Sequence, residues 1–266
     1  MNKPVKKIIA VGGGENGRIN SKGIKMPYEL GGIDREIVRA SGKEKPRFLF
    51  LAHSKIGRDP SEEEKYINIE RGIFGDALGC DFRTLLIRDV TDEPAKAKEY
   101  LDWADIIYEG GGNTAAMVAF WRETGFDLLL RDAWEAGKLM CGISAGAICW
   151  FSMGNSGLEE YKSREVNAVE ALGFIDAYLS PHCEEAWKRE SEIKSLKRLD
   201  KVGLSLSNCS AIEIVGDGYR VICSDPADSA FKPYVLRTFC KDGEILEEKL
   251  DPSSEFKPLA GLLSMD

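Results

Sequence analysis

The chain has 266 residues and a formal net charge of −8, with 36 Lys and Arg against 44 Asp and Glu. An acidic chain without a dominant basic stripe is not expected to bind nucleic acid. No apolar run approaches the ~20 residues that span a bilayer, and the N-terminus lacks a signal-peptide core. We therefore expect a cytoplasmic protein without a membrane partner. Seven cysteines with no C-x-x-C pair predict neither a disulfide framework nor a zinc site, and no metal or cofactor is expected.

Strand-like and helix-like segments alternate through the first two thirds of the chain. Strands are expected at 7–11, 47–52, 83–87, 105–108 and 138–141, and helices at 34–40, 94–103, 184–201 and from a capping box at Ser61. This alternation predicts a mostly parallel sheet with helices on both faces. Its functional site should lie at the carboxyl ends of the strands.

The last part of the chain has a different pattern. Strand-like runs are expected at 211–215, 219–223, 234–239 and 243–250. The first two flank Gly216-Asp217-Gly218, which indicates a hairpin. We interpret 1–266 as one α/β domain, in which 211–266 is a β-rich tail packed on the edge of the sheet.

A G-x-S-x-G segment gives the first indication of chemistry. Gly142-Ile143-Ser144-Ala145-Gly146 follows a strand-like run and precedes a helix-like one. This is the context of a nucleophile elbow, where a serine on a strained turn exposes its hydroxyl. Because such a turn crowds the backbone, its small neighbours fit this interpretation. The alternative is a tight turn without chemistry.

A second glycine cluster fits the same interpretation. Gly110-Gly111-Gly112 follows the strand expected at 105–108, and Asn113 or Thr114 can cap the helix after it. A serine hydrolase needs backbone N–H donors for the oxyanion of its intermediate. Gly111 or Gly112 could supply one donor and Ala145 the other. A Gly-rich loop that only turns the chain remains the alternative.

The chain offers two histidines as the general base. His53 follows the strand expected at 47–52, and His182 lies 38 residues after Ser144. Pro181 stiffens the chain before His182, which favours His182, but both are kept. One further glycine motif is excluded: residues 12–17 satisfy the G-x-G-x-x-G dinucleotide fingerprint, but no helical pattern follows them.

Taken together, these segments resemble the peptidase E family of aspartyl dipeptidases, relatives of the cyanophycinases. The matching pieces are Gly110-Gly111-Gly112-Asn113-Thr114, Gly142 to Ala147 and Pro181-His182, over roughly residues 5 to 225. The resemblance implies a three-layer αβα sandwich of the class I glutamine amidotransferase type. It also implies that Ser144 is the nucleophile and His182 the base.

The same resemblance implies roles for further residues. Asn113 and Thr114 would line the substrate pocket, and Arg189 would bind an acidic side chain of the substrate. The histidine-orienting acid of the family is replaced here by Asn208, and Glu159 is the other candidate for that role. An asparagine can hold the imidazole tautomer but does not offset the charge of the imidazolium.

The expected function is a serine peptidase for small peptides with an N-terminal acidic residue, acting through an acyl-enzyme. The alternative is a weak or inactive member of the fold that binds a small molecule in the same cleft. A small peptide is the only partner expected, and both a monomer and a dimer remain open.

Overall fold

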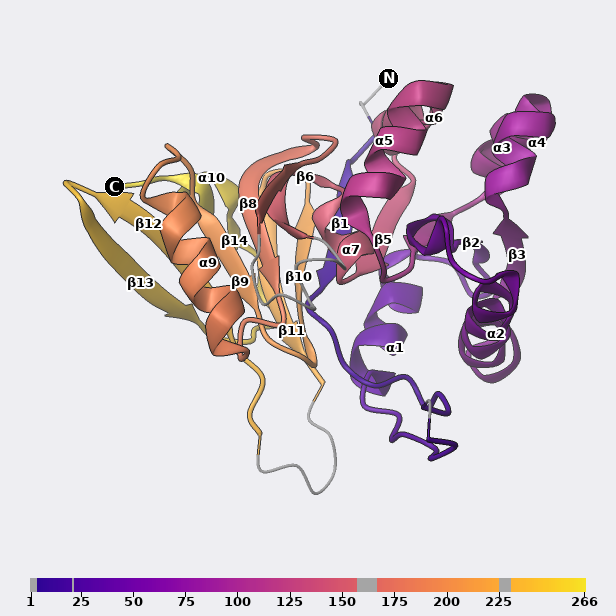
Figure 1. Ribbon diagram of the computed structural model, residues 1–266, viewed down its shortest axis with the longest axis horizontal. Coiled ribbons are helices and arrows are strands. Elements are labelled where there is room, and N and C mark those ends of the chain that lie inside the picture. Colours follow the sequence, from indigo (N-terminus) through magenta and orange to yellow (C-terminus); the bar gives the residue numbers. More distant parts are fainter. Residues whose placement is uncertain (1–3, 21, 157–166, 225–230) are drawn as a thin grey trace.

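The computed structural model describes residues 4–20, 22–156, 167–224 and 231–266, and it contains two sheets that lie side by side (Figure 1). The larger sheet has eight strands in the order β14-β11-β10-β1-β5-β4-β2-β3. Its parallel part consists of β1 (Lys7–Val11), β2 (Arg47–Leu51), β3 (Asp81–Leu85), β4 (Ile106–Glu109) and β5 (Leu139–Ile143). All five parallel strands lie within one residue or two of the segments expected from the sequence.

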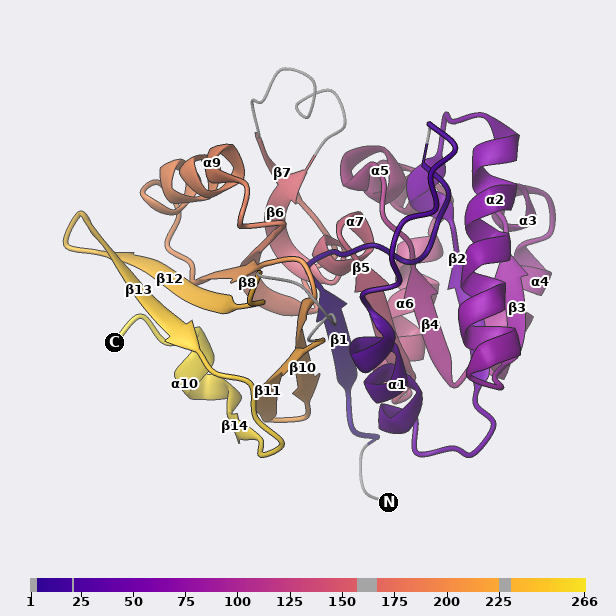
Figure 2. The same cartoon turned by 90° about the horizontal axis from the view of Figure 1, so that it is seen from below.

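Helices cover both faces of this sheet. They are α1 (Gly31–Ala40), α2 (Pro60–Glu70), α3 (Ile87–Asp92), α4 (Pro94–Trp103), α5 (Thr114–Thr124) and α6 (Phe126–Glu135), with a short 3-10 turn η1 (His53–Lys55) and a π-helical segment η2 (Arg71–Ala77). Figure 2 shows α1 and α2 in front of the sheet. Side chains of β1 alternate between two cores: Ile9 packs with α1 and η2, and Ile8 packs with α4, α5 and α6. This alternation is how a sheet buried on both faces forms the middle of three layers.

The second sheet was not expected from the sequence. It has six strands in the order β13-β12-β9-β8-β6-β7. They are β6 (Phe151–Ser156), β7 (Asn167–Glu170), β8 (Ile175–Pro181), β9 (Gly203–Leu206), β12 (Val235–Lys241) and β13 (Glu244–Leu250). Strands β6, β8 and β9 run parallel to one another, and α9 (Ala186–Leu196) packs on them.

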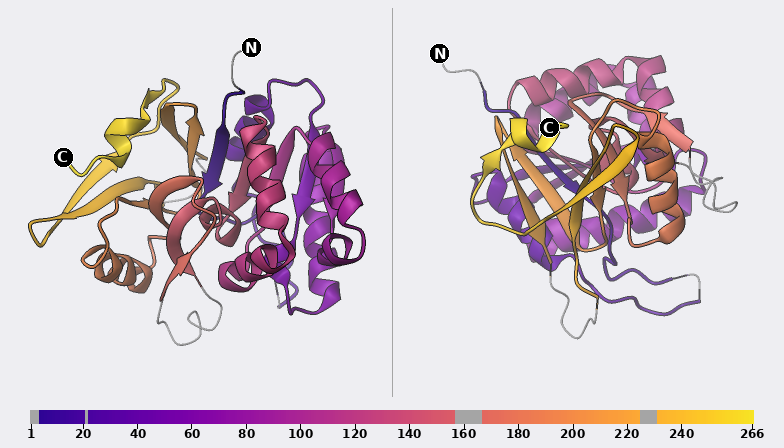
Figure 3. Two further views of the ribbon diagram at one scale, coloured as in Figure 1. Left: turned by 90° about the horizontal axis from the view of Figure 1, so that it is seen from above. Right: turned by 90° about the vertical axis from the view of Figure 1, so that its left-hand side faces the viewer.

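The C-terminal tail belongs to both sheets. β10 (Ser210–Val215) pairs antiparallel with β1, and β11 (Gly218–Cys223) and β14 (Lys257–Pro258) continue that edge. Strands β12 and β13 extend the second sheet instead, and α10 (Leu259–Leu263) closes the tail (Figure 3). The tail was expected to pack on the edge of one sheet. Its strands instead form backbone pairs with both sheets.

Some local expectations need correction. The helix expected to begin with a capping box at Ser61 starts at Pro60, because the carboxylate of Asp59 accepts from the Ser61 N–H at 2.8 Å. Proline fits the first helical position, because the backbone N–H that it lacks would have no partner there.

The helix α3 was not anticipated, and α9 is shorter than the helix expected at 184–201. After β1 the next helix is α1, so no helix begins at the 12–17 loop. Within the described ranges no helix is both long and apolar enough to cross a membrane.

Candidate active site

The carboxyl ends of strands from both sheets meet at one place. Gly12 follows β1, Gly110 follows β4 and Ser144 follows β5 in the larger sheet, whereas His182 follows β8 in the second sheet. Two backbone hydrogen bonds hold the end of β1 against the segment that leads from β9 of the second sheet into β10 of the larger one: the Gly12 N–H donates to Ser210 O at 2.8 Å, and the Cys209 N–H donates to Gly13 O at 2.9 Å. The site is therefore built at the junction of the sheets.

Ser144 sits on a strained turn between β5 and the short helix α7 (Ala145–Ile148). Its backbone has φ 56° and ψ −113°, a conformation that a non-glycine residue adopts only when the surroundings enforce it. A Cβ added at Gly142 would lie 2.1 Å from Gly146 O, and one added at Gly146 would lie 2.1 Å from Glu109 O. The flanking glycines are therefore required by the close approach of β4, β5 and α7, as in a nucleophile elbow.

His182 and Asn208 complete a chain of hydrogen bonds with Ser144. The Ser144 Oγ lies 3.0 Å from His182 Nε2, and His182 Nδ1 lies 2.7 Å from Asn208 Oδ1. Since Oδ1 can only accept, Nδ1 carries the hydrogen and donates to Asn208, and Nε2 accepts from the Ser144 hydroxyl. His182 itself has φ 56°. This tautomer is the one that a general base for Ser144 requires.

Gly13 supports this arrangement and was missed by the sequence reasoning. A Cβ at Gly13 would lie 2.1 Å from Asn208 Oδ1 and 2.3 Å from His182 Cε1. Any side chain there would displace the imidazole or the amide. The three glycines after β1 were the available signal, but no role beside the histidine was expected for them.

The surroundings of His182 keep its ring neutral. Burial and, to a smaller extent, the positive charge of Lys188 lower the pKa of His182 to about 3, against the opposing effect of the Asn208 hydrogen bond. A neutral imidazole can accept a proton from Ser144. In the free protein the His182 ring therefore stays neutral, the form that a base needs, even at pH values well below 6.5.

A carboxylate missed at the sequence level also lies beside Asn208. The Asn208 backbone N–H donates to Glu184 Oε2 at 3.1 Å, and burial raises the pKa of Glu184. Glu184 therefore fixes the backbone of Asn208. Glu159, the other candidate for orienting the histidine, lies outside the described residues.

Asn208 substitutions test this arrangement. Asn208→Ala removes one neutral hydrogen bond, worth about 0.5–1.5 kcal/mol, and should lower turnover about threefold to tenfold with little change in KM. Asn208→Asp should leave turnover unchanged or raise it, and the added anion should raise the pKa of His182. The acidic limb of kcat/KM should then move to higher pH, which a profile from pH 4 to 9 would measure. Full activity of Asn208→Ala would remove Asn208 from this role.

The two glycine donors are not equivalent. The Gly111 N–H donates to the Tyr66 hydroxyl at 3.0 Å, so it is already engaged. The Ala145 N–H is in the first turn of α7, where backbone N–H groups have no partner within the helix. A Cβ at Gly112 would lie 2.2 Å from Ser54 O, so Gly112 packs tightly on η1. The geometry thus favours Gly112 and Ala145 as the oxyanion donors over Gly111.

The three expected substrate-binding residues have different settings. Asn113 is half-buried and caps α5, its Oδ1 accepting from the Ala116 N–H at 3.1 Å. Thr114 is fully buried, so it does not line an open pocket. The expectation that Thr114 lines the pocket is therefore wrong, and that for the partly exposed Asn113 stays a prediction.

Arg189 is engaged by two carboxylates. Its guanidinium pairs with the buried carboxylate of Glu192 at 2.7 Å, donates to Ser205 and Thr238, and pairs with Glu247 on β13. Two carboxylates already neutralise this cation. The expected role of Arg189 in binding an acidic substrate is therefore not supported by its position, which joins α9 to the second sheet.

His53 is a core residue. It is fully buried, its Nδ1 accepts from Trp121 Nε1 at 2.9 Å, and its Nε2 donates to Leu85 O at 3.0 Å. Burial lowers the pKa of His53 to about 4. Since both ring nitrogens are occupied, His53 is not available to Ser144, and the choice between the two histidines falls on His182.

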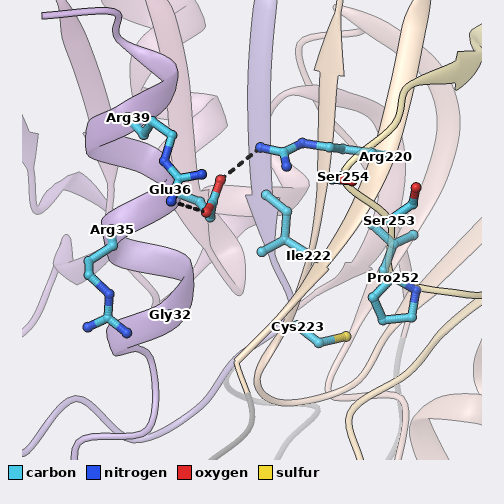
Figure 4. Close-up of a pocket in the computed structure, with 11 residues that line it drawn as sticks. Gly32, Arg35, Glu36, Arg39, Arg220, Ile222, Cys223, Pro252, Ser253 and Ser254 are labelled. Atoms are coloured by element: carbon cyan, nitrogen blue, oxygen red, sulfur yellow. Dashed lines mark hydrogen bonds and ion pairs between the residues drawn. The ribbon is translucent and has the colours of Figure 1, made fainter.

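A separate open cavity of about 560 Å³ lies between α1 and β11 (Figure 4). Three arginines line it, but the carboxylate of Glu36 pairs with both Arg39 and Arg220, each at 2.9 Å. Arg220 also pairs with Glu213. None of the residues that form the Ser144 hydrogen-bond chain lines this cavity, so it is not part of the candidate active site.

Comparisons with known proteins show the family to which the chain is similar. A model of Peptidase family S51 matches residues 19–222. The uncharacterized peptidase YgaJ of Bacillus subtilis (strain 168) is 32% identical over 178 residues, which are 67% of this chain and 69% of that protein. The uncharacterized peptidase PM1590 of Pasteurella multocida (strain Pm70) is 30% identical over 119 residues, 43% of this chain and 52% of that protein.

Solved structures show the same fold. A peptidase from an acI-B1 Actinobacterium superposes with a TM-score of 0.70 and 21% identity, covering 96% of this chain and 97% of that one. A putative peptidase E protein from Listeria monocytogenes EGD-e superposes with a TM-score of 0.59 and 19% identity, covering 83% of this chain and all of that one. Likeness at this identity supports the architecture rather than a substrate.

Proposed function

Because the chain belongs to peptidase family S51, a family of serine peptidases, we propose that it hydrolyses small peptides with an N-terminal acidic residue through Ser144, His182 and Asn208. The observation that carries the proposal is the continuous chain of hydrogen bonds from the Ser144 hydroxyl to His182 Nε2 at 3.0 Å and from His182 Nδ1 to Asn208 at 2.7 Å. The preference for an acidic residue rests on the resemblance to peptidase E.

The geometry supports the following sequence of steps. Ser144 Oγ attacks the scissile carbonyl carbon while His182 Nε2 takes its proton, and the N–H groups of Gly112 and Ala145 stabilise the oxyanion. The imidazolium then protonates the leaving amine as the C–N bond breaks. Water, deprotonated by the same nitrogen, attacks the acyl carbon of the acyl-enzyme. The ester bond to Oγ then breaks, and the imidazolium returns the proton to Oγ, which releases the acid and restores the Ser144 hydroxyl. Asn208 keeps Nδ1 as the donor throughout, so Nε2 always faces Ser144.

Labelling with a fluorophosphonate, followed by a panel of Asp-X, Glu-X and Ala-X dipeptides, tests this proposal. We expect the protein to be labelled and to cleave Asp-X and Glu-X faster than Ala-X, and we expect Ser144→Ala to lose both properties. Ser152→Ala is the matched control, because the Ser152 hydroxyl donates to Ala177 O within the second sheet. Binding of a dipeptide without labelling or cleavage would favour the binding-protein alternative.

A further inference from the structure

Lys55 is a half-buried cation without an acceptor among the described residues. It ends η1, directly after β2. Other half-buried lysines donate to oxygen atoms: Lys7 to Ala40 O, Lys96 to Asp89, Lys138 to Asp102 O and Lys201 to Asp176. The backbone of Lys55 is bonded within η1, but its ammonium makes no hydrogen bond or ion pair within the described ranges. The ammonium lies over the ring of Tyr66, 4.8 Å from the centroid.

This cation lies beside the oxyanion loop. The hydroxyl of Tyr66 accepts from the Gly111 N–H at 3.0 Å, and a Cβ at Gly110 would lie 2.5 Å from the Tyr66 ring. Ser54, which precedes Lys55, packs on Gly112, where an added Cβ would lie 2.2 Å from Ser54 O. A Cβ at Gly111 would in turn lie 3.4 Å from the Cβ of Ser144. Lys55 is thus separated from the nucleophile by one aromatic ring and one glycine loop.

No carboxylate forms a direct ion pair with the Lys55 ammonium among the described residues. Burial lowers the pKa of Lys55, and the cations Arg58 and Arg18 lower it further, whereas Glu62 and Glu109 raise it. Glu109 is fully buried, and burial raises the pKa of Glu109 well above its usual value, which favours its neutral form. A partly desolvated cation without an anion is unfavourable, and an arriving carboxylate relieves that cost.

We propose that Lys55 binds a carboxylate of the peptide substrate next to Ser144, and that this carboxylate is the acidic side chain of the N-terminal residue. The inference rests on the proposed function and gives it a specificity-determining residue in place of Arg189, which is already neutralised by Glu192 and Glu247. Ammonium–carboxylate hydrogen bonds are among the stronger ones in proteins, so one such contact is enough to separate Asp from Asn.

Paired substrates measure this contact. Asp-X and Asn-X differ in charge at the N-terminal side chain, and Ala-Ala and its C-terminal amide differ in charge at the other end. We expect the wild type to cleave Asp-X with a kcat/KM about tenfold to a hundredfold above that of Asn-X. Lys55→Met should remove most of that ratio, and Lys55→Arg should keep it. Lys65→Met, an exposed lysine of α2, is the control and should keep it fully.

An Asp-X to Asn-X ratio that is unchanged in folded Lys55→Met would overturn the inference. A second result would also overturn it: Lys55→Met no longer distinguishes Ala-Ala from its amide but keeps the Asp-X to Asn-X ratio. Lys55 would then bind the C-terminal carboxylate of the peptide. Calorimetric binding of Asp-X and Asn-X to Ser144→Ala separates this inference from the proposed function. Lys55-dependent tighter binding of Asp-X supports it even if the wild type cleaves nothing, and equal binding of both peptides opposes it.

Discussion

Replacing His182 by alanine is expected to lower the rate of Ser144 acylation about 10²- to 10⁴-fold, the usual contribution of a general acid–base group. Without the imidazole, the Ser144 hydroxyl loses the acceptor 3.0 Å away, and no other described histidine can reach it. The rate of fluorophosphonate labelling and kcat for a dipeptide would measure the loss. KM should change little, because His182 acts on the reacting atoms rather than on substrate affinity.

His53→Ala is the matched control, since it removes the other histidine of the chain. Its ring lies in the core, with its centroid 5.4 Å from that of Phe126, and the deletion leaves the Trp121 N–H and Leu85 O without their partner. We expect the free energy of unfolding to fall by about 2–5 kcal/mol, while labelling of the folded fraction persists. Equal loss of labelling in both folded variants would contradict the assignment of His182 as the base.

The residues with the strongest local signals were placed well from the sequence. The elbow around Ser144 has its own steric signature, because Gly142 and Gly146 must be small for β5 to turn into α7. The larger sheet followed from the alternation of strands and helices, since parallel strands need such crossovers. Because functional sites of such sheets lie at the carboxyl ends of the strands, the sequence also predicted that Ser144 and the loop at Gly111 would meet there.

Features that depend on pairing between distant segments could not be predicted in the same way. The second sheet joins β6, β8 and β9 to β12 and β13, and nothing in the local pattern of any one strand specifies those partners. Arg189 has the sequence context of a substrate-binding arginine, but its partner Glu247 lies 58 residues away on β13. Its neutralisation by that strand is visible only once the fold is known.

Tyr66 shows the same limit within the site. Its place on α2 has an ordinary helical pattern, and its contact with Gly111 crosses 45 residues of sequence. That contact decides which glycine N–H remains for an oxyanion. The sequence alone kept Gly111 and Gly112 as equal alternatives, and only the engaged hydrogen bond separates them.

The oxyanion loop gives the second large effect that we expect, from Gly112→Ala. An added Cβ would lie 2.2 Å from Ser54 O and 2.7 Å from the Ser54 carbonyl carbon. These are backbone atoms held by η1, so the loop itself must shift and carry the Gly112 N–H away from the oxyanion. Loss of one such donor lowers kcat by about 10²- to 10³-fold. Single-turnover acylation, with a thermal melt to show that the variant folds, would measure this loss.

Gly111→Ala is the comparison that makes this prediction specific. Its nearest neighbour would be the Cβ of Ser144 at 3.4 Å, followed by Ile143 O at 3.5 Å, which is normal van der Waals contact. The backbone can therefore stay in place, and the N–H of that residue can keep its bond to Tyr66. We expect Gly111→Ala to lose much less activity than Gly112→Ala. If the order were reversed in folded variants, Gly111 would be the oxyanion donor, and the hydrogen bond to Tyr66 would have to open when substrate binds.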